Sequence, residues 1–282
     1  PEATQDLDEV VVVGYGTQKK GDVTTAITSV KTKDLDQRPV TSAAQAIQGR
    51  AAGIQVVQPN GAPGAGLAVR IRGNTSISAS NDPLYVADGI PVQDINGIAP
   101  TDIESMQVLK DASSAAIYGS RAANGVVLIT TKQGKRNEPK ISVNTYVGIS
   151  QVAKRIESLN TAQYKELMDE TGAVTLPSGL TDKTDWFDET FRKSLIRNTQ
   201  LSISNATENT KYYLSAGTSK DEGVIRSSYF ERYNLRLNLE TKMRKWLTFE
   251  TNLSYADYSS NGIITGTGSN RAGVVLSMTR LP

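Results

Sequence analysis

The sequence predicts an α+β domain followed by antiparallel transmembrane β-strands, the amino-terminal part of a β-barrel of about 22 strands. Three observations support this fold class. Up to about residue 135, short β-branched segments alternate with glycine turns and short helical segments. After Pro139, apolar and polar residues alternate over five successive segments, which is the period of a strand with two unlike faces. The connections between those segments are alternately short and long, as in outer-membrane barrels.

The composition argues against several classes of function. The 282 residues include no histidine and no cysteine, which disfavours a zinc site and histidine-dependent catalysis. We expect no catalytic residues, no metal and no cofactor. The 31 basic and 29 acidic residues nearly balance, so the sequence lacks the excess of basic residues that is typical of nucleic-acid-binding proteins. No apolar run approaches the roughly 20 residues of a membrane-spanning helix.

A run of four valines at residues 10–13 is the first notable segment. One interpretation is a buried parallel strand, because valine favours strands. The acidic residues before the run, and Gly14, Gly16 and Lys19-Lys20-Gly21 after it, favour a short extended peptide beside a polar hinge. Such a peptide can add to the sheet edge of another protein. A dinucleotide-binding pattern fails because Lys19 stands where the third glycine is needed.

The next residues predict short strands, a capped helix and a hairpin. Ser42 and Gln45 have capping-box spacing at the start of an alanine-rich helix. Asp88-Gly89 between apolar residues is the usual signal for a tight hairpin, and Pro91 places its second strand at an edge or a bulge. Strands are expected at residues 23–30, 54–57 and 69–72, with the hairpin over 84–92.

Residues 103–135 are predicted to close the α+β domain. A strand at 105–109, a short helix at 112–118 capped by Asp111, and a strand at 125–131 would form a small βαβ crossover. The last strand is apolar and β-branched, so we expect it at the centre of a sheet.

The second half of the chain predicts five amphipathic strands of roughly nine to eleven residues, the length that crosses an outer membrane. They are expected at residues 140–150, 198–205, 211–219, 232–241 and 247–255. The fourth shows the pattern most clearly, with Tyr233, Leu235, Leu237 and Leu239 on one face and Asn234, Arg236, Asn238 and Glu240 on the other. Period alone also fits a soluble β-sandwich. The matched lengths and the alternating connections favour the membrane barrel.

The first long connection contains two further features. Residues 160–171 predict a capped helix with a solvated acidic face. The acidic side chains Asp185, Asp188 and Glu189 surround Trp186, a grouping that occurs in glycoside hydrolases, but no partner motif accompanies them and catalysis is disfavoured. Five strands do not close a barrel, so we expect the sequence to be the front part of a longer polypeptide.

Ordered motifs along the chain resemble the SusC/RagA family of TonB-dependent outer-membrane transporters of Bacteroidota. They lie at residues 8–16, 49–53, 69–73, 83–89 and 103–135, the last with Lys110-Asp111-Ala112 and Tyr118-Gly119-Ser120-Arg121-Ala122-Ala123-Asn124-Gly125. The resemblance covers essentially the whole chain. It implies a TonB box and coupling segment at 1–21, a plug domain at 22–135, and the first five or so barrel strands at 136–282.

The resemblance also implies site residues. The TonB box, which pairs as a strand with TonB in the periplasm, corresponds to Asp8, Glu9, Val10, Val11, Val12 and Val13. Arg72 and Arg121 correspond to plug positions that pair with acidic groups on the barrel wall, which would here lie beyond Pro282. The polar loop 74–82 is a candidate substrate-facing surface through Asn74, Ser76, Asn81 and Asp82, although it is equally typical of an ordinary solvated loop.

The function implied is TonB-dependent import of oligomeric nutrients, glycan or peptide, across the bacterial outer membrane. The partners implied are TonB, a SusD-like lipoprotein at the extracellular face, the oligosaccharide or oligopeptide substrate, and outer-membrane lipid. The alternative is a non-transporting interaction module, either a plug-like domain or a soluble β-rich adhesin. That alternative predicts a chain that folds alone in water, whereas the transporter hypothesis predicts that residues 232–241 face lipid.

Overall fold

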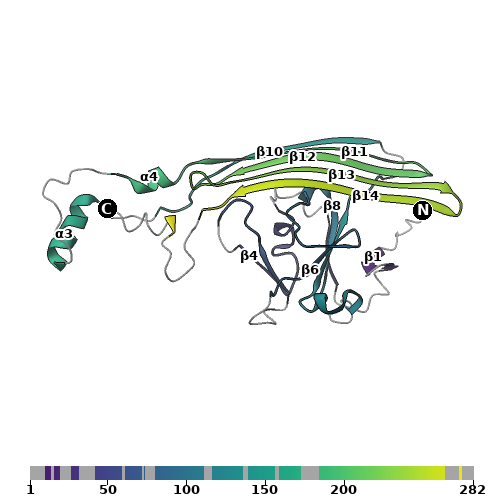
Figure 1. Cartoon of the computed structure of the whole chain (residues 1–282), viewed down its shortest axis with the longest axis horizontal. Coiled ribbons are helices and arrows are strands. Elements are labelled where there is room, and N and C mark those ends of the chain that lie inside the picture. Colours follow the sequence, from purple (N-terminus) through teal and green to yellow (C-terminus); the bar gives the residue numbers. More distant parts are fainter. Residues whose placement is uncertain are drawn as a thin grey trace, which may run out of the picture.

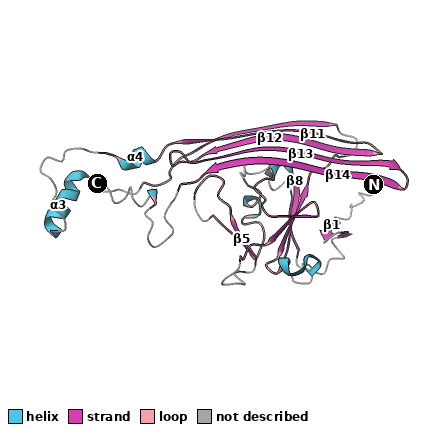
Figure 2. Cartoon of the chain, viewed as in Figure 1, coloured by secondary structure: helices cyan, strands magenta, loops and turns pink. Residues whose placement is uncertain are grey.

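The computed structural model describes two bodies, a small α/β unit and a long sheet that arches over it (Figures 1 and 2). We call them the amino-terminal unit, formed by the described residues from 27 to 135, and the wall sheet, formed by strands β10 to β14. The structure describes residues 10–13, 16–19, 27–31, 42–58, 61–71, 73, 80–110, 116–135, 139–155, 159–172, 184–263 and 273–274.

A five-stranded mixed sheet forms the centre of the amino-terminal unit. Its spatial order is β3 (Ile27–Lys31), β8 (Ile103–Leu109), β9 (Val126–Thr131), β6 (Leu84–Ala87) and β7 (Ile90–Val92). Strands β6 and β9 run parallel, and the other neighbours are antiparallel. The prediction that the apolar strand after Gly125 is central is confirmed.

Strand β9 is apolar throughout because both of its faces are buried. Val127 and Ile129 belong to a core that is covered by a hairpin and a short helix, formed by β4 (Ile54–Val57), β5 (Ala68–Ile71) and η2 (Gln45–Ile47). Val126 and Leu128 point to the other face and pack with Tyr118 of η4 (Ala116–Ala122). The sheet is therefore sandwiched between two apolar layers.

The βαβ crossover predicted for residues 103–135 is wrong. Strands β8 and β9 are antiparallel neighbours, and the connection between them contains the 3-10 turns of η4. Gly119 interrupts η4 with a φ of 68°, so the connection cannot form a helix long enough to return along the seven-residue strand β8. The proposed cap, Asp111, lies outside the described residues. The helix predicted from Ser42 exists only as the three-residue η2, with the Gln45 amide donating to Ser42 Oγ over 3.3 Å.

The predicted hairpin turn between β6 and β7 is confirmed. Asp88 and Gly89 both have positive φ angles, 46° and 83°. A two-residue hairpin turn whose central residues are both left-handed requires such angles. Pro91 lies in β7, which is an edge strand, as predicted.

The valine run forms strand β1 (Val10–Val13), which pairs antiparallel with β2 (Gly16–Lys19). These strands form a separate two-stranded sheet, so the interpretation of the run as a buried parallel strand is wrong. In Figure 1, β1 lies beside the amino-terminal unit, on the side away from α3 and α4.

The wall sheet is antiparallel and follows chain order. Its strands are β10 (Lys140–Ser150), β11 (Ser194–Ala206), β12 (Thr210–Glu222), β13 (Tyr229–Arg244) and β14 (Leu247–Asn261). Only β10, with 11 residues, has the predicted length; β13 reaches 16 residues. The backbone pairing continues past the alternating segment, for example to Glu222 opposite Tyr229, because ladder hydrogen bonds do not need an apolar face.

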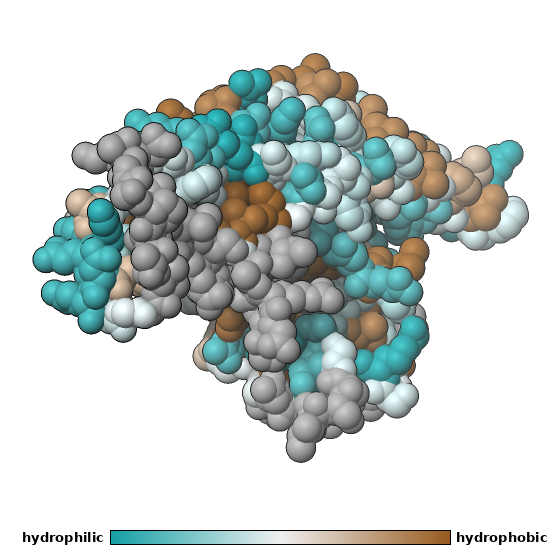
Figure 3. Space-filling model, turned by 60° about the vertical axis from the view of Figure 1, so that its left-hand side comes forward, coloured by the Kyte–Doolittle hydropathy of each residue, from teal (hydrophilic) through white to brown (hydrophobic). Residues whose placement is uncertain are grey.

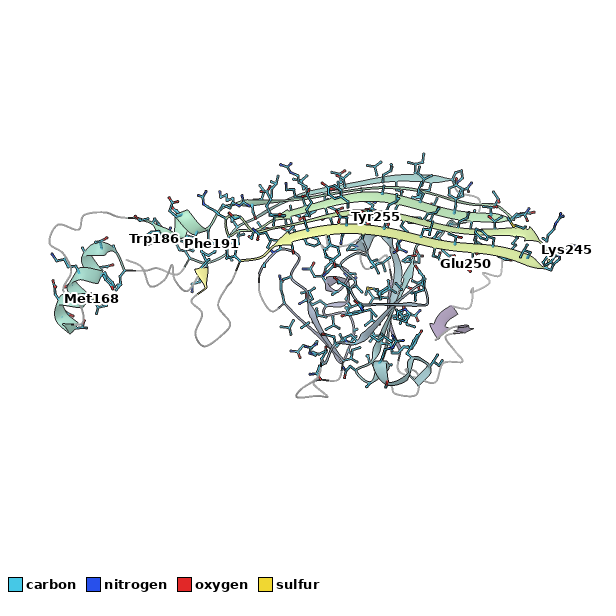
Figure 4. The ribbon with its side chains drawn as sticks, in the orientation of Figure 1. Met168, Trp186, Phe191, Lys245, Glu250 and Tyr255 are labelled. Carbon is cyan, nitrogen blue, oxygen red and sulfur yellow. The ribbon has the colours of Figure 1, made fainter. Side chains whose placement is uncertain are left out.

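Short and long connections lie at opposite ends of the wall sheet. Tight turns join β11 to β12 and β13 to β14, and Lys245 marks the second of them (Figure 4). The connection from β10 to β11 contains α3 (Thr161–Thr171) and α4 (Trp186–Thr190), which lie at the other end. Asn160 caps α3 in a capping box, which confirms the predicted helix. No helix among the described residues is long and apolar enough to cross a membrane.

The wall sheet buries its polar face and exposes its apolar face. Leu235 is 49% exposed, whereas Asn238, on the opposite face of the same strand, is 3% exposed. The apolar side chains of β10 and β14 are also exposed, among them Ile141, Val147, Leu253 and Tyr255. Figure 3 shows hydrophobic residues along the convex outer side of the sheet. This is the reverse of a soluble sheet and matches strands that face lipid outside and protein inside.

Replacing Leu235 by arginine is expected to lower the free energy of unfolding in lipid vesicles by about 2–4 kcal/mol, because the charge would enter the hydrocarbon. The measurement is a urea titration of the protein folded into vesicles. The matched control is Met243→Arg near the tight turn, which should change stability by roughly 0–1 kcal/mol. Equal effects at the two positions would contradict a lipid-facing sheet.

Candidate functional site

The contact between the amino-terminal unit and the wall sheet is the main functional feature of the described structure. The parallel strands β6 and β9 end, and the antiparallel strand β8 begins, at the same edge of the central sheet. This topology brings together the β6–β7 turn, the 93–102 connection and the end of β9. Polar side chains from these segments meet the inward-facing side chains of β11, β12, β13 and β14.

Asp88 joins the two bodies at the centre of this contact. Its carboxylate accepts hydrogen bonds of 2.8 Å from both the amide and the hydroxyl of Thr131, which hold it in place. Arg236 of β13 donates from Nη1 to Asp88 Oδ2 over 3.2 Å, forming an ion pair with little solvent exposure. Beside it, Asn238 donates to Thr131 Oγ1 over 2.7 Å and to the Lys132 carbonyl over 2.9 Å. Two inward side chains of one strand therefore meet the end of β9 and the turn beside it.

Asp102 forms a second connection and is only 1% exposed. It lies in η3 (Pro100–Asp102), and its Oδ1 accepts hydrogen bonds from Gln200 Nε2 over 3.0 Å and from the Tyr213 hydroxyl over 2.8 Å. A carboxylate buried this deeply needs such donors, because an unpaired charge would be strongly disfavoured. Burial of Asp102 thus depends on β11 and β12.

A third group of contacts lies nearer the end of the sheet that carries α4. Buried Arg232 donates from Nη1 to the Asn96 carbonyl over 2.9 Å, while its Nε and Nη2 have no hydrogen-bond partner among the described residues. The Tyr258 hydroxyl donates to Asp94 over 2.9 Å. A cavity of about 320 Å³ lies beside Arg232, between the glycine-rich loop 61–67 and the ends of β10 to β13.

Gly134 lets the chain pass from one body to the other. A Cβ atom at this position would lie 1.9 Å from the Asn205 carbonyl oxygen and 2.7 Å from that of Tyr212. Both neighbours are strand backbone, which cannot yield as a flexible side chain can. Glycine is therefore required where the segment after β9 crosses the inner face of the wall sheet.

The residues predicted as a TonB box are only partly described. Asp8 and Glu9 lie outside the described residues, and Val10, Val11, Val12 and Val13 form β1. Their role as a TonB box, which would pair with TonB, remains a prediction. Their backbone is extended and paired along one edge with β2.

The predicted contacts of Arg72 and Arg121 stay a prediction, because their acidic partners are expected beyond Pro282. Arg72 lies outside the described residues, and Arg121 is exposed on η4 and pairs with no acidic residue among those described. Helix η4 lies on the side of the amino-terminal unit away from the wall sheet (Figure 2). In the described contact the amino-terminal unit supplies the acids, Asp88, Asp94 and Asp102, and the wall supplies the donors.

The predicted substrate-facing loop is described only at its end. Asn74 and Ser76 lie outside the described residues, and Asn81 and Asp82 follow at the start of the next described segment. Asp82 pairs with Arg70 and accepts a 2.8 Å hydrogen bond from the Ser80 hydroxyl. Partial burial acts to raise the pKa of Asp82, but the hydrogen bonds from Ser80 and Arg70 and the charge of Arg70 together lower it. A substrate role for this loop stays a prediction.

The acidic residues around Trp186 have a structural role. Asp185 caps α4 by accepting hydrogen bonds from the Phe187 and Asp188 amides, and it forms an ion pair with Arg155. The hydrogen bond from Arg155 is the main reason that the pKa of Asp185 is lowered. The guanidinium of Arg155 also lies 4.7 Å from the centre of the Phe187 ring. These contacts give Asp185 a structural role at the start of α4.

The acidic residues of the contact were missed from the sequence, although part of the signal was present. The alternation in residues 232–241 separated Asn234, Arg236 and Asn238 from the apolar face and so identified the inward donors. The acids of the contact, Asp88, Asp94 and Asp102, lie in turns and connections, where no period marks a residue as facing a partner. Asp88 was recognised only as a turn residue.

Changing Asp88 to asparagine is expected to destabilise the contact by about 2–3 kcal/mol. Asparagine keeps the positive φ and an acceptor for Thr131, but it leaves Arg236 buried without a counter-charge. The double variant Asp88→Asn with Arg236→Met should recover most of the loss, because the unpaired charge is gone. The readout is the opening free energy of β6 and β7 amides, measured by hydrogen exchange in the detergent-solubilised protein.

The control for that substitution is Asp82→Asn, which removes the same charge from an exposed ion pair. The Asp82 side chain is 54% exposed, so its loss should change the opening free energy by less than about 1 kcal/mol. If Asp82→Asn and Asp88→Asn have equal effects, the ion pair between the two bodies does not stabilise their contact.

Comparison with known proteins places this arrangement in a family. Residues 19–126 match the TonB-dependent Receptor Plug Domain. The chain is 42% identical over 278 residues to TonB-dependent receptor P26 of Formosa agariphila, covering 93% of this chain and 28% of that protein. It is 41% identical over 247 residues to TonB-dependent receptor SusC of Bacteroides thetaiotaomicron, covering 84% of this chain and 25% of that protein.

A solved structure shares the fold of both bodies. The RagAB peptide importer in its open-open state superposes with a TM-score of 0.77 and 33% identity, over 90% of this chain and 33% of that one. The chain thus spans between a quarter and a third of the length of these relatives. The chain belongs to the SusC/RagA-like TonB-dependent receptors of the outer membrane, and it contains their plug domain followed by antiparallel strands of their barrel.

Proposed function

We propose that the receptor imports oligomeric nutrients, either oligosaccharides or oligopeptides, across the outer membrane with energy supplied through TonB. In this proposal residues 1–21 couple to TonB, residues 22–135 form the plug that closes the pore, and residues 136–282 contribute about five strands of the barrel wall. The plug is the gate, and its contact with the wall must be rearranged for a substrate to pass.

The observation that carries this proposal is the reversed polarity of the wall sheet. Its apolar face is exposed, as a lipid-facing surface requires, and its polar face is covered by the amino-terminal unit. A soluble β-rich adhesin would bury the apolar face instead. Among the described residues the contact is made largely of hydrogen bonds and the ion pair of Asp88 with Arg236, while Phe230 packs against the loop at Gly64. It can therefore be broken and remade in the presence of water.

Strand β1 supports the coupling role because, among the described residues, only one of its two edges is paired. The strands are separated by two residues and pair from Val13 with Gly16 to Val10 with Lys19. In a hairpin closed in this way, alternate amides point toward the partner strand. We infer that Val11 and Val13 direct their amides to β2, and that Val10 and Val12 direct theirs to the open edge. TonB would add a third strand there.

The end of the wall sheet that carries α3 and α4 is proposed to face the cell exterior. Longer connections of membrane barrels lie on that side and short turns on the periplasmic side. We propose that a SusD-like lipoprotein covers this end, on the resemblance to SusC and to the RagAB peptide importer. Trp186 and Met168 lie in the connection that such a partner would reach (Figure 4).

The substrate class stays open between two chemistries. RagAB is a peptide importer, and this favours oligopeptides. The name of SusC, a TonB-dependent receptor, does not indicate a substrate. The cavity beside Arg232 has a polar lining that includes Asn96, Ser219 and Asp221, which can bond to hydroxyls or to peptide groups. We propose that substrate passes this cavity when the plug moves. Competition between oligosaccharide and oligopeptide libraries for the purified receptor would distinguish the two classes.

Replacing Val12 with proline is expected to abolish uptake and to leave substrate binding unchanged. Proline removes the amide that would bond to TonB, while the pairing between β1 and β2 needs no donor at this position. The measurements are uptake in cells, substrate affinity of the purified receptor, and site-specific cross-linking of β1 to TonB. Cross-linking should disappear together with uptake.

The matched control is Val12→Ala, which removes side-chain atoms and keeps the amide. It should retain most uptake, because added strands bind chiefly through backbone hydrogen bonds. Normal uptake by the proline variant would refute the assignment of β1 as the TonB-pairing strand. Loss of substrate binding in the same variant would show instead that the change had damaged the plug.

A further inference from the structure

The tight turn between β13 and β14 combines positive charge with large exposed apolar side chains. We call residues 242–246 the basic turn. It contains three cations, Lys242, Arg244 and Lys245, all of them exposed. Met243 and Trp246 lie among them and are 60% and 82% exposed, respectively, so Trp246 has the most exposed large apolar side chain of the described residues.

The charges of the basic turn are not neutralised by nearby acids. None of its three cations forms an ion pair with a described residue. Glu240, the nearest acid along β13, is already paired with Lys211 of β12 over 2.9 Å. The adjoining turn between β11 and β12 contributes one acid, Glu208, and contacts the basic turn through the Asn209 carbonyl, which accepts from the Lys242 amide over 2.7 Å. The surface therefore keeps a net positive charge.

The basic turn directly continues the apolar outer face of the wall sheet. Leu235, Leu237 and Leu239 alternate along that face and lead into the turn. The pairing register shifts between Lys242 and Arg244, so that Met243 is left without a partner on β14. The turn forms the end of the sheet, as the position of Lys245 shows (Figure 4). Cations and an exposed tryptophan thus lie where a lipid-facing surface ends.

We propose that the basic turn binds the headgroups of anionic phospholipids in the leaflet that faces the periplasm. The three cations would donate to headgroup phosphates, and Trp246 and Met243 would insert at the level of the headgroups and upper acyl chains. The position in this leaflet rests on the orientation in the proposed function. The continuity of the turn with the lipid-facing row favours a lipid over a periplasmic protein as the occupant.

The test compares anionic and zwitterionic lipid on the intact receptor in neutral detergent. Phosphatidylglycerol should raise the thermal midpoint of the receptor, and phosphatidylcholine should raise it less. The variant Lys242→Gln, Arg244→Gln and Lys245→Gln should lose this difference. Its apparent affinity for phosphatidylglycerol in native mass spectrometry should fall on the order of a hundredfold, because each cation near anionic lipid contributes a factor of roughly five.

The matched control removes three exposed cations elsewhere, by Lys154→Gln, Lys165→Gln and Lys220→Gln. It changes the net charge equally and should keep the full response to phosphatidylglycerol. Lys242→Arg with Lys245→Arg keeps the charge of the turn and should also retain the response. This variant separates loss of lipid binding from a damaged fold.

Two outcomes would overturn the proposal. One is an unchanged preference for phosphatidylglycerol in the triple glutamine variant. The other is an unchanged lipid response together with loss of a cross-link to a periplasmic protein, which would assign the turn to that protein. The lipid measurements involve no transport, so failure of uptake in the Val12→Pro experiment and failure of this proposal remain distinguishable.

Discussion

The polar inner face of the wall sheet is the constraint on which the rest of the structure depends. A sheet that exposes leucine and tyrosine and buries asparagine, arginine and glutamine would be unstable alone in water. It needs an apolar medium outside and a source of hydrogen-bonding groups inside. The amino-terminal unit supplies the second requirement through Asp88, Asp102 and the end of β9. The unit and the sheet are therefore complementary in polarity as well as in shape.

Local backbone geometry decides which residues can take part in this complementarity. Asp88 occupies a left-handed turn position, where its side chain projects from the edge of the central sheet and meets both Thr131 and Arg236. One residue thereby closes a hairpin and joins two bodies. Gly134 has a comparable double role, because its missing side chain lets the connecting segment lie against the strand backbone. Both positions combine a local requirement with a long-range contact.

The sequence predicted periodic features well and long-range pairing poorly. The five wall strands, helix α3, the Asp88-Gly89 turn and the central place of β9 follow from alternation, capping and turn chemistry. Strand direction in residues 103–135 was wrong because short connections of this kind can return either way, and Gly119 decides the matter by a φ angle that the sequence does not show. The strand ends were underestimated, since backbone pairing extends beyond the apolar pattern.

The candidate site was predictable on one side only. Inward donors on β13 share a strand period, and so they can be recognised without a structure. The acids that they and the neighbouring strands meet are single residues in turns and short connections far away in sequence, for example Asp88, which pairs with Arg236 across 148 positions. Nothing local distinguishes such an acid from a solvated one such as Asp82. The contacts expected for Arg72 and Arg121 involve partners beyond Pro282 and stay a prediction, separate from the described contact, in which the amino-terminal unit supplies the acids.

The hydrogen-bonded character of the plug–wall contact has a mechanical consequence. Each bond contributes a net stabilisation of roughly 0.5–1.5 kcal/mol, because water can replace either partner once the bond is broken. A force applied along the pore axis would therefore meet a series of low barriers, with the pair of Asp88 and Arg236 as the highest of them. The dry core around β9 offers no such replacement by water. Slippage would begin at the polar boundary between plug and wall, before the central sheet of the plug loses its strand order.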